Sequence, residues 1–187
     1  MNVKILRPLN LLGLLAVLGA CSPSEPQPET SEATLRQLTG GDVIGFENEV
    51  GAQSWLGLSY AASSAEENRW RAPQPVEPWE GRFEALEHSA PCPQIINTLS
   101  SEATGRSVGE LYGSEDCLKL DVYAPAGAGP GTPDRPVMMW IHGGSNTWGY
   151  ASHYDGAQLA QEQNVVVVVI QYRLGPLGFF AHPAVSE

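Results

Sequence analysis

The run Val165–Ile170 restricts the fold of this chain more than any other part of the sequence. It places six β-branched residues in succession. A strand that is apolar at every position is buried on both faces, which is typical of a central strand in a parallel sheet with helices on either side. Six residues are also far too few to span a bilayer, which needs about twenty. The run therefore predicts the core strand of an α/β fold.

The segment before this run has the order of a βαβ unit. Val137–Ile141 is a short continuous apolar run, and Tyr154–Asn164 has helical character, with Leu159 and Ala160 available to face inward. Strand, helix and strand in that order predict a right-handed crossover between parallel strands.

Shorter strand patterns stand earlier in the chain. Val43–Phe46 and Ser54–Tyr60 are expected to be strands around a turn, and Asp116–Tyr123 alternates apolar and polar residues, which fits a strand with one covered face. The Pro-containing stretches 61–81 and 124–136 are expected to be loops. The fold class is therefore α/β, with a mixed, mostly parallel central sheet that short antiparallel strands precede.

The N-terminus has the pattern of an export signal. Lys4 and Arg7 give a basic start, and the apolar run Leu9–Ala20 that follows is too short for a membrane-spanning helix. We interpret residues 1–20 as a signal peptide.

Cys21 directly follows Leu18-Gly19-Ala20, and this ending resembles a bacterial lipobox, whose Cys becomes the lipidated first residue of the mature protein. Ordinary cleavage after Ala20, or an uncleaved anchor, is the alternative. Acyl chains on Cys21 would anchor an exported lipoprotein to a membrane, because each buried methylene contributes about 0.8 kcal/mol. Residues 21–39, rich in Pro, Ser and Glu, are expected to be a flexible tether. The folded domain is expected to span 40–187.

Composition limits the partners and the chemistry. The formal net charge of −11 disfavours binding to nucleic acid, whose phosphates require a basic surface. No Cys-x-x-Cys motif occurs and the histidines lack ligand spacing, so we expect no metal site and no cofactor; the histidines are His88, His142, His153 and His182. With Cys21 lipidated, Cys92 and Cys117 remain, an even number in a compartment that permits disulfides. Two free buried thiols are the alternative.

The segment His142-Gly143-Gly144-Ser145 immediately follows the predicted strand 137–141. Backbone at such a turn can direct consecutive N–H groups at one point, and small residues let a substrate carbonyl approach closely. An oxyanion hole requires donors aimed in this way at developing negative charge, and such loops serve lipases and esterases. Taken alone, the segment is equally compatible with a tight turn of no catalytic role.

Four segments stand out along the chain: RWRAPQP at 69–75, EDCLKLDVY at 115–123, WIHGGS at 140–145 and QYRLGPLGF at 171–179. Together they resemble the type-B carboxylesterase and cholinesterase family, which has the α/β-hydrolase fold. They occur in the family's order and at about its spacing, and the resemblance covers residues 40–180.

The resemblance implies a serine esterase that cleaves small-molecule carboxylic esters through an acyl-enzyme. Its oxyanion donors would be the backbone N–H groups of Gly144 and Ser145, in the loop that His142 and Gly143 begin. Ser145 stands where the family has a third glycine, so the N–H survives while a Cβ narrows the allowed φ and ψ. Asn146 follows where the family often has an aromatic residue. The resemblance also implies that Cys92 pairs with Cys117.

The sequence has one Gly-x-Ser-x-Gly match, at residues 105–109, and we reject Ser107 as the nucleophile. The residues before it, 95–104, are mostly polar and lack a buried strand, and the match precedes the His-Gly-Gly segment, whereas the family's nucleophile follows it. The family's nucleophile, acid and His would come tens of residues beyond Phe180.

We therefore expect this 187-residue chain to be the N-terminal portion of the domain and inactive alone. It should leave Val165–Ile170 at an open sheet edge and aggregate. Two alternatives remain: a non-catalytic cholinesterase-like surface lipoprotein or adhesion module, and a pseudo-enzyme that binds through its half sheet.

Overall fold

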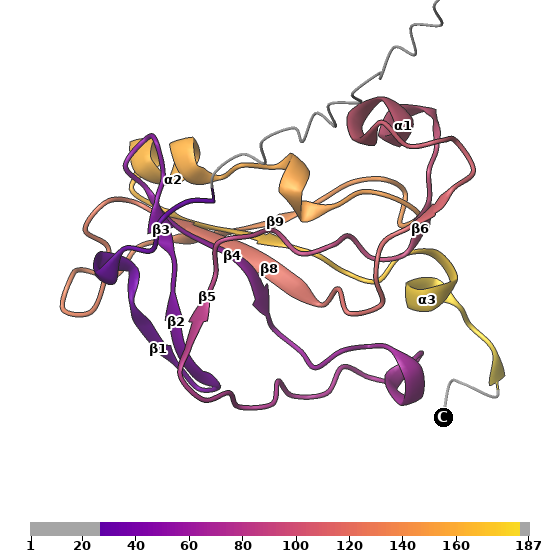
Figure 1. Cartoon of the computed structure of the whole chain (residues 1–187), viewed down its shortest axis with the longest axis horizontal. Helices are drawn as coiled ribbons and strands as arrows, with labels where there is room; N and C mark the ends of the chain where they lie inside the picture. Colours follow the sequence, from indigo (N-terminus) through magenta and orange to yellow (C-terminus); the bar gives the residue numbers. More distant parts are fainter. Residues whose placement is uncertain (1–26, 184–187) are drawn as a thin grey trace, which may run out of the picture.

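The computed structural model describes residues 27–183. Its centre is a five-stranded sheet in which β3, β4, β8 and β10 are antiparallel neighbours and the last pair, β10 and β9, is parallel (Figure 1). This confirms the predicted mixed sheet, whereas within residues 27–183 it is mostly antiparallel rather than mostly parallel, because only β10 and β9 pair in parallel. In spatial order the strands are β3 (Phe46–Glu47), β4 (Gln53–Ser59), β8 (Lys119–Ala124), β10 (Val166–Ile170) and β9 (Val137–Ile141).

Helix α2 (Ala157–Gln163) covers one face of this sheet. Ala157 and Ala160 are buried against Val167 and Val169 of β10. Leu159 is 42% exposed, so the expectation that it faces inward was wrong. The helix directs Ala157 and Ala160, three residues apart, at the sheet, and Leu159 falls outside that stripe.

Strand β10 is not at an open edge, which corrects the expectation stated above. It pairs with β8 on one side and β9 on the other, and β9 forms the edge. The prediction that this strand is buried on both faces is only partly confirmed. Val167 and Val169 are buried on the α2 side, whereas Val166, Val168 and Ile170 on the other side are half-buried.

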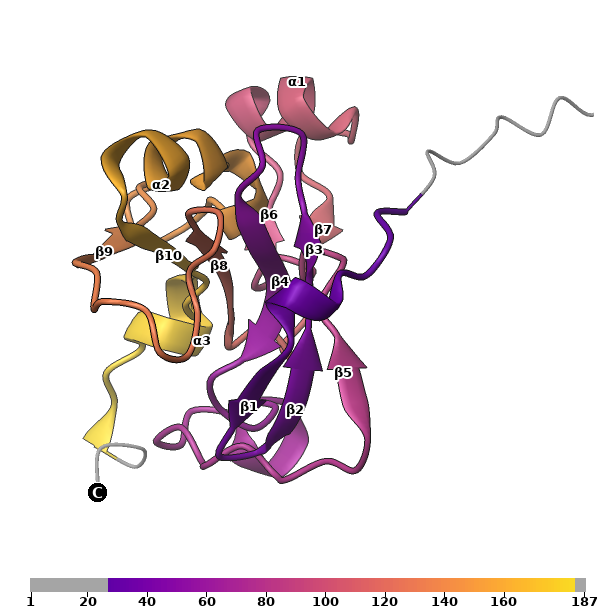
Figure 2. The same cartoon turned by 90° about the vertical axis from the view of Figure 1, so that its left-hand side faces the viewer.

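A second sheet packs against the other face of the central sheet, opposite α2 (Figure 2). It consists of β1 (Arg36–Leu38), β2 (Gly41–Ile44) and β5 (Arg82–Glu84). The predicted tether at 21–39 is therefore too long, because β1 and the 3-10 turn Glu32–Thr34 belong to the fold. The Arg36 guanidinium lies 4.9 Å from the Trp55 ring centroid, which fixes this segment against β4.

The disulfide between Cys92 and Cys117 is present, as predicted. The loop that it closes, residues 92–117, is called the disulfide loop and contains a two-stranded ribbon and a short helix. The remaining elements of the chain are single turns or short helices. These are β6 (Gln94–Ile95), α1 (Thr98–Thr104), β7 (Leu111–Tyr112), the 3-10 turns Glu66–Asn68 and Ala151–His153, and α3 (Gly175–Phe179).

The predicted signal peptide and the lipidated Cys21 lie outside the described residues. Within residues 27–183, no helix is both long enough and apolar enough to cross a membrane.

Candidate active site

The loop after β9, residues 142–149, is called the glycine loop here. Strands β9 and β10 are parallel and in register, so their C-terminal ends meet at one edge of the sheet. The glycine loop leaves β9 at that edge, beside the segment Gln171–Leu174 that leaves β10. In open α/β sheets this edge is where ligands bind.

His142 lies at the start of the glycine loop, and its side chain is buried. The ring stacks on Tyr172 with centroids 4.4 Å apart, and the Tyr172 hydroxyl donates a hydrogen bond to the His142 carbonyl. Burial lowers the pKa of His142, partly opposed by its hydrogen bond to the Gly143 carbonyl. His142 is therefore a neutral structural residue of the loop rather than a solvent-accessible base.

The neutral ring has a defined tautomer. His142 Nδ1 lies 2.9 Å from the Gly143 carbonyl oxygen, which can only accept, so the hydrogen-bonding pattern assigns the proton to Nδ1. Nε2 is buried and has no hydrogen-bond partner among the described residues.

The turn of the glycine loop depends on its residue types. Gly144 has a φ of +115°, and a Cβ there would lie 1.7 Å from the Trp148 carbonyl oxygen, so only glycine fits. Ser145 and Asn146 follow with φ values of +56° and +59°, in the left-handed region. Serine can adopt that region at some cost, which is how the turn accommodates Ser145 in place of glycine.

The turn leaves backbone donors unused. The Gly144 carbonyl accepts from the N–H groups of Thr147 and Trp148, at 3.0 and 3.2 Å. In the part of the chain that the structure describes, the N–H groups of Gly144 and Ser145 donate to no protein acceptor. Consecutive unpaired donors in a rigid turn can stabilise an anionic oxygen.

A cavity of about 580 Å³ borders the glycine loop. It lies between the disulfide loop, the glycine loop and the N-terminal end of α3, and no ionisable side chain lines it. The lining residues are Pro93–Asn97, Leu111, Thr147, Trp148 and Leu174–Leu177. The cavity suits an uncharged ligand group.

Ser107 does not occupy the position that a nucleophile of this fold requires. Helix α1 ends at Thr104, its C-cap Gly105 adopts the left-handed conformation, and Ser107 follows in an exposed turn. The Ser107 N–H donates to Glu110, 3.3 Å away. Ser107 thus follows a helix, whereas a nucleophile elbow joins a strand to a helix.

No group of three or more His, Cys, Asp and Glu side chains that could hold a metal ion occurs within residues 27–183.

Sequence reasoning missed three residues that hold the glycine loop: Gln94, Gly149 and Tyr172. Gln94 is the strongest case, because it is 4% exposed and bonds Gly149 with both ends of its amide. The available signal was its place two residues after the predicted disulfide cysteine, next to the apolar pair Ile95-Ile96.

The chain belongs to the carboxylesterase family, whose family model matches residues 31–185. Cocaine esterase from Homo sapiens is 40% identical over 163 residues, which are 83% of this chain and 29% of that protein. Fumonisin B1 esterase from Sphingopyxis macrogoltabida is 37% identical over 179 residues, which are 95% of this chain and 30% of that protein.

Solved structures agree with this assignment. A structure of PNB esterase superposes with a TM-score of 0.70 at 36% sequence identity, covering 81% of this chain and 30% of that one. The chain therefore spans about 30% of the length of the relatives it matches.

Proposed function

We propose that the described residues form the N-terminal part of a carboxylic ester hydrolase and supply its oxyanion hole. The observation that carries this proposal is the pair of unpaired N–H groups at Gly144 and Ser145, at the C-terminal end of a parallel strand. Acyl transfer passes through a tetrahedral intermediate whose oxygen is negatively charged, and such donors stabilise that charge. Family membership supports an ester as the substrate.

In this mechanism a serine attacks the ester carbonyl, the alcohol leaves, and water then hydrolyses the acyl-enzyme. The Gly144 and Ser145 N–H groups would hold the carbonyl oxygen in both steps. The neutral apolar cavity would receive an uncharged group of the ester, because ionic groups would lose their hydration there without a partner.

The serine, the base and the acid would come from outside residues 27–183. Strand β9 supports this proposal, because it is the edge of the central sheet and all five of its residues are exposed. A further strand paired with β9 would end beside the glycine loop, where a nucleophile elbow could present its serine to the Gly144 and Ser145 N–H groups.

The test is hydrolysis of p-nitrophenyl butyrate by the full-length protein. We expect turnover, and we expect Gly144→Ala to lower kcat. Alanine keeps the N–H, but its Cβ would collide with the Trp148 carbonyl oxygen and move that N–H out of position. The loss should approach the factor of about 10²–10³ that is usual for one oxyanion donor. Ser107→Ala is the matched control and should retain full activity. Absence of turnover in the full-length protein would overturn the proposal in favour of a non-catalytic surface module, and so would wild-type kcat in Gly144→Ala.

We also propose that Cys21 carries a lipid anchor that holds the exported protein at a membrane. The support is the lipobox-like Leu18-Gly19-Ala20 before it and the short apolar run that precedes. Cys21→Ser should move the protein from the membrane fraction to the soluble fraction. An unchanged distribution on fractionation would contradict the anchor.

A further inference from the structure

Gln94 makes a two-point hydrogen-bonded pair with Gly149 in the glycine loop. The Gly149 N–H donates to Gln94 Oε1 at 2.9 Å, and Gln94 Nε2 donates to the Gly149 carbonyl at 3.1 Å. Nε2 also donates to the Cys92 carbonyl at 3.2 Å. The Gln94 side-chain amide thus connects the N–H and carbonyl of Gly149 to the carbonyl of Cys92, which forms the disulfide. We call this contact the Gln94–Gly149 amide pair.

Gly149 in turn lies directly against the first residues of its own loop. Its φ is +118°, and a Cβ built on it would lie 2.6 Å from the Gly143 carbonyl oxygen and 2.6 Å from His142 Nδ1. Those two atoms make the hydrogen bond that orients the Gly143 carbonyl. Because Gly149 packs directly against both atoms, its position limits where His142 Nδ1 and the Gly143 carbonyl oxygen can lie.

The Gly143 carbonyl and the Gly144 N–H belong to one peptide group. A trans peptide is planar, so its C=O and N–H point in opposite directions. When His142 Nδ1 fixes the direction of the Gly143 carbonyl, it also fixes the direction of the Gly144 N–H. That N–H is one of the two proposed oxyanion donors.

We propose that Gln94 is a positioning residue for the oxyanion hole, acting through Gly149 on the Gly143–Gly144 peptide to aim the Gly144 N–H. This inference rests on the proposed function. Gln94 itself contacts Gly149 and Cys92 rather than the donors. Its loss should therefore weaken stabilisation of the transition state more than binding of the ground-state ester.

A second buried glutamine connects the residues that flank this amide pair, so the loss of Gln94 leaves these parts of the chain connected. Gln171 is 1% exposed, accepts from the Ala151 N–H at 2.7 Å and donates to the Ala90 carbonyl at 3.1 Å. The chain just before Cys92 and the chain just after Gly149 are thus held together through Gln171, independently of Gln94. A Gln94 variant should retain the fold while the glycine loop becomes less ordered.

The first experiment compares Gln94→Met with Gln53→Met in the full-length protein. Methionine keeps the side-chain length and removes all three hydrogen bonds. We expect kcat for p-nitrophenyl butyrate to fall about tenfold to a hundredfold, with little change in KM. This fall should not exceed the one that follows complete loss of an oxyanion donor. Gln53, also buried, bonds Arg36 of β1, so Gln53→Met should keep kcat. Equal effects of the two substitutions, or a change in KM alone, would overturn the inference.

The isosteric variant Gln94→Glu adds a pH readout. A protonated carboxyl offers one donor and one acceptor and can form the pair with Gly149, whereas a carboxylate offers only acceptors to the Gly149 and Cys92 carbonyls. The ratio of its kcat to that of the wild-type protein should therefore rise as pH falls. A ratio that is constant with pH would contradict the positioning role.

Hydrogen exchange tests the inference without relying on catalysis. The Thr147 and Trp148 N–H groups bond the Gly144 carbonyl, and neither bonds Gln94. Gln94→Met should make both exchange faster by about tenfold, and Gln53→Met should not. If the wild-type protein shows no ester turnover, the proposed function fails, while exchange still decides whether Gln94 orders the loop. Unchanged exchange at both amides would overturn the inference.

Discussion

At the scale of single residues, the glycine loop depends on positions where a side chain has no room. Gly144 lies against the Trp148 carbonyl, and Gly149 lies against the Gly143 carbonyl and the His142 ring. Ser145, in the same turn, tolerates a Cβ because its φ of +56° lies in the small left-handed region open to ordinary residues. The sequence motif predicted which residues form the turn, but the distinction between these positions required the packing around them.

Gly149→Ala tests this packing. The new Cβ would collide with the Gly143 carbonyl and the His142 ring in addition to straining the backbone at φ +118°. We expect the free energy of unfolding to fall by more than the ~1–3 kcal/mol of a strained φ alone, measured by urea denaturation. Gly51→Ala is the matched control, because Gly51 has a φ of +78° and nothing within 4 Å of a Cβ. Equal losses for the two variants would show that the contacts of Gly149 do not matter.

At the scale of elements, the sequence predicted the strands that carry several apolar residues close together, whether or not the fold buries them. The run 137–141 is β9 without change, and 165–170 and 54–60 differ from β10 and β4 by a residue at their ends. Strands β1, β5, β6 and β7 were missed because each has only two or three residues, most of them at least partly exposed. Strand β5, for example, pairs with β2, which lies about 40 residues earlier in the chain, and no local sequence pattern records such a partner.

The candidate site divides in the same way. The His-Gly-Gly motif identified the loop, and the family resemblance pointed to Gly144, Ser145 and the disulfide. Both are recognised from short contiguous segments of the sequence. The Gln94–Gly149 amide pair joins residues 55 positions apart. A buried amide has no periodicity, so only the folded arrangement shows which backbone groups it satisfies.

The disulfide loop gives a prediction for this scale. The bond between Cys92 and Cys117 spans 25 residues, for which the chain-entropy description gives about 3.5 kcal/mol. Adding a reductant should lower the free energy of unfolding by about that amount, measured by urea denaturation. The double variant Cys92→Ala/Cys117→Ala should start at the lower value and show no further response. Identical stability of the wild-type protein with and without reductant would contradict the prediction.

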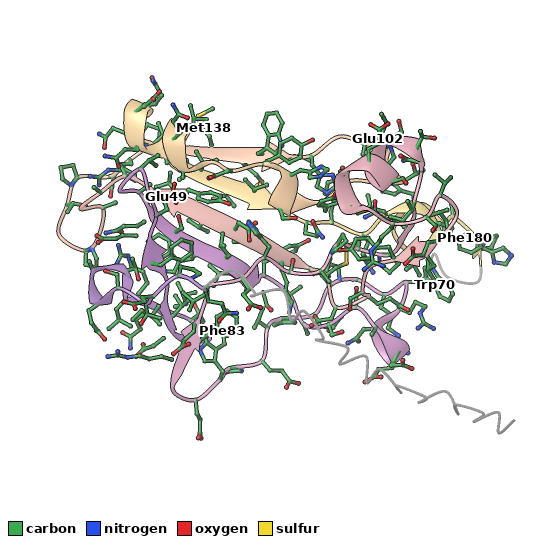
Figure 3. The ribbon with its side chains drawn as sticks, turned by 45° about the horizontal axis from the view of Figure 1, so that its top comes forward. Glu49, Trp70, Phe83, Glu102, Met138 and Phe180 are labelled. Atoms are coloured by element: carbon green, nitrogen blue, oxygen red, sulfur yellow. A yellow bond between two sulfur atoms is a disulfide. The ribbon has the colours of Figure 1, made fainter. Side chains whose placement is uncertain are left out.

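At the scale of the whole molecule, the β9 edge of the central sheet is uncovered in the described residues, and so is the part of one face that lies next to it. Every residue of β9 is exposed, including Met138 at the rim of the sheet (Figure 3). Because side chains alternate along a strand and β9 is in register with β10, Val137, Met139 and Ile141 share a face with the half-buried Val166, Val168 and Ile170. An apolar edge strand of this kind is a template for pairing with another strand.

We therefore expect the 187-residue chain, expressed by itself, to self-associate through β9. Its association should increase with protein concentration, measured by sedimentation velocity. Met139→Lys should reduce it, because Met139 is 61% exposed in the middle of the edge strand and a lysine there opposes pairing. Leu159→Lys on α2 is the matched control, since Leu159 is also exposed, at 42%, but belongs to a helix rather than to the edge strand, and it should leave association unchanged. A chain that stays monomeric at all concentrations, or that responds equally to both substitutions, would show that the β9 edge does not drive association.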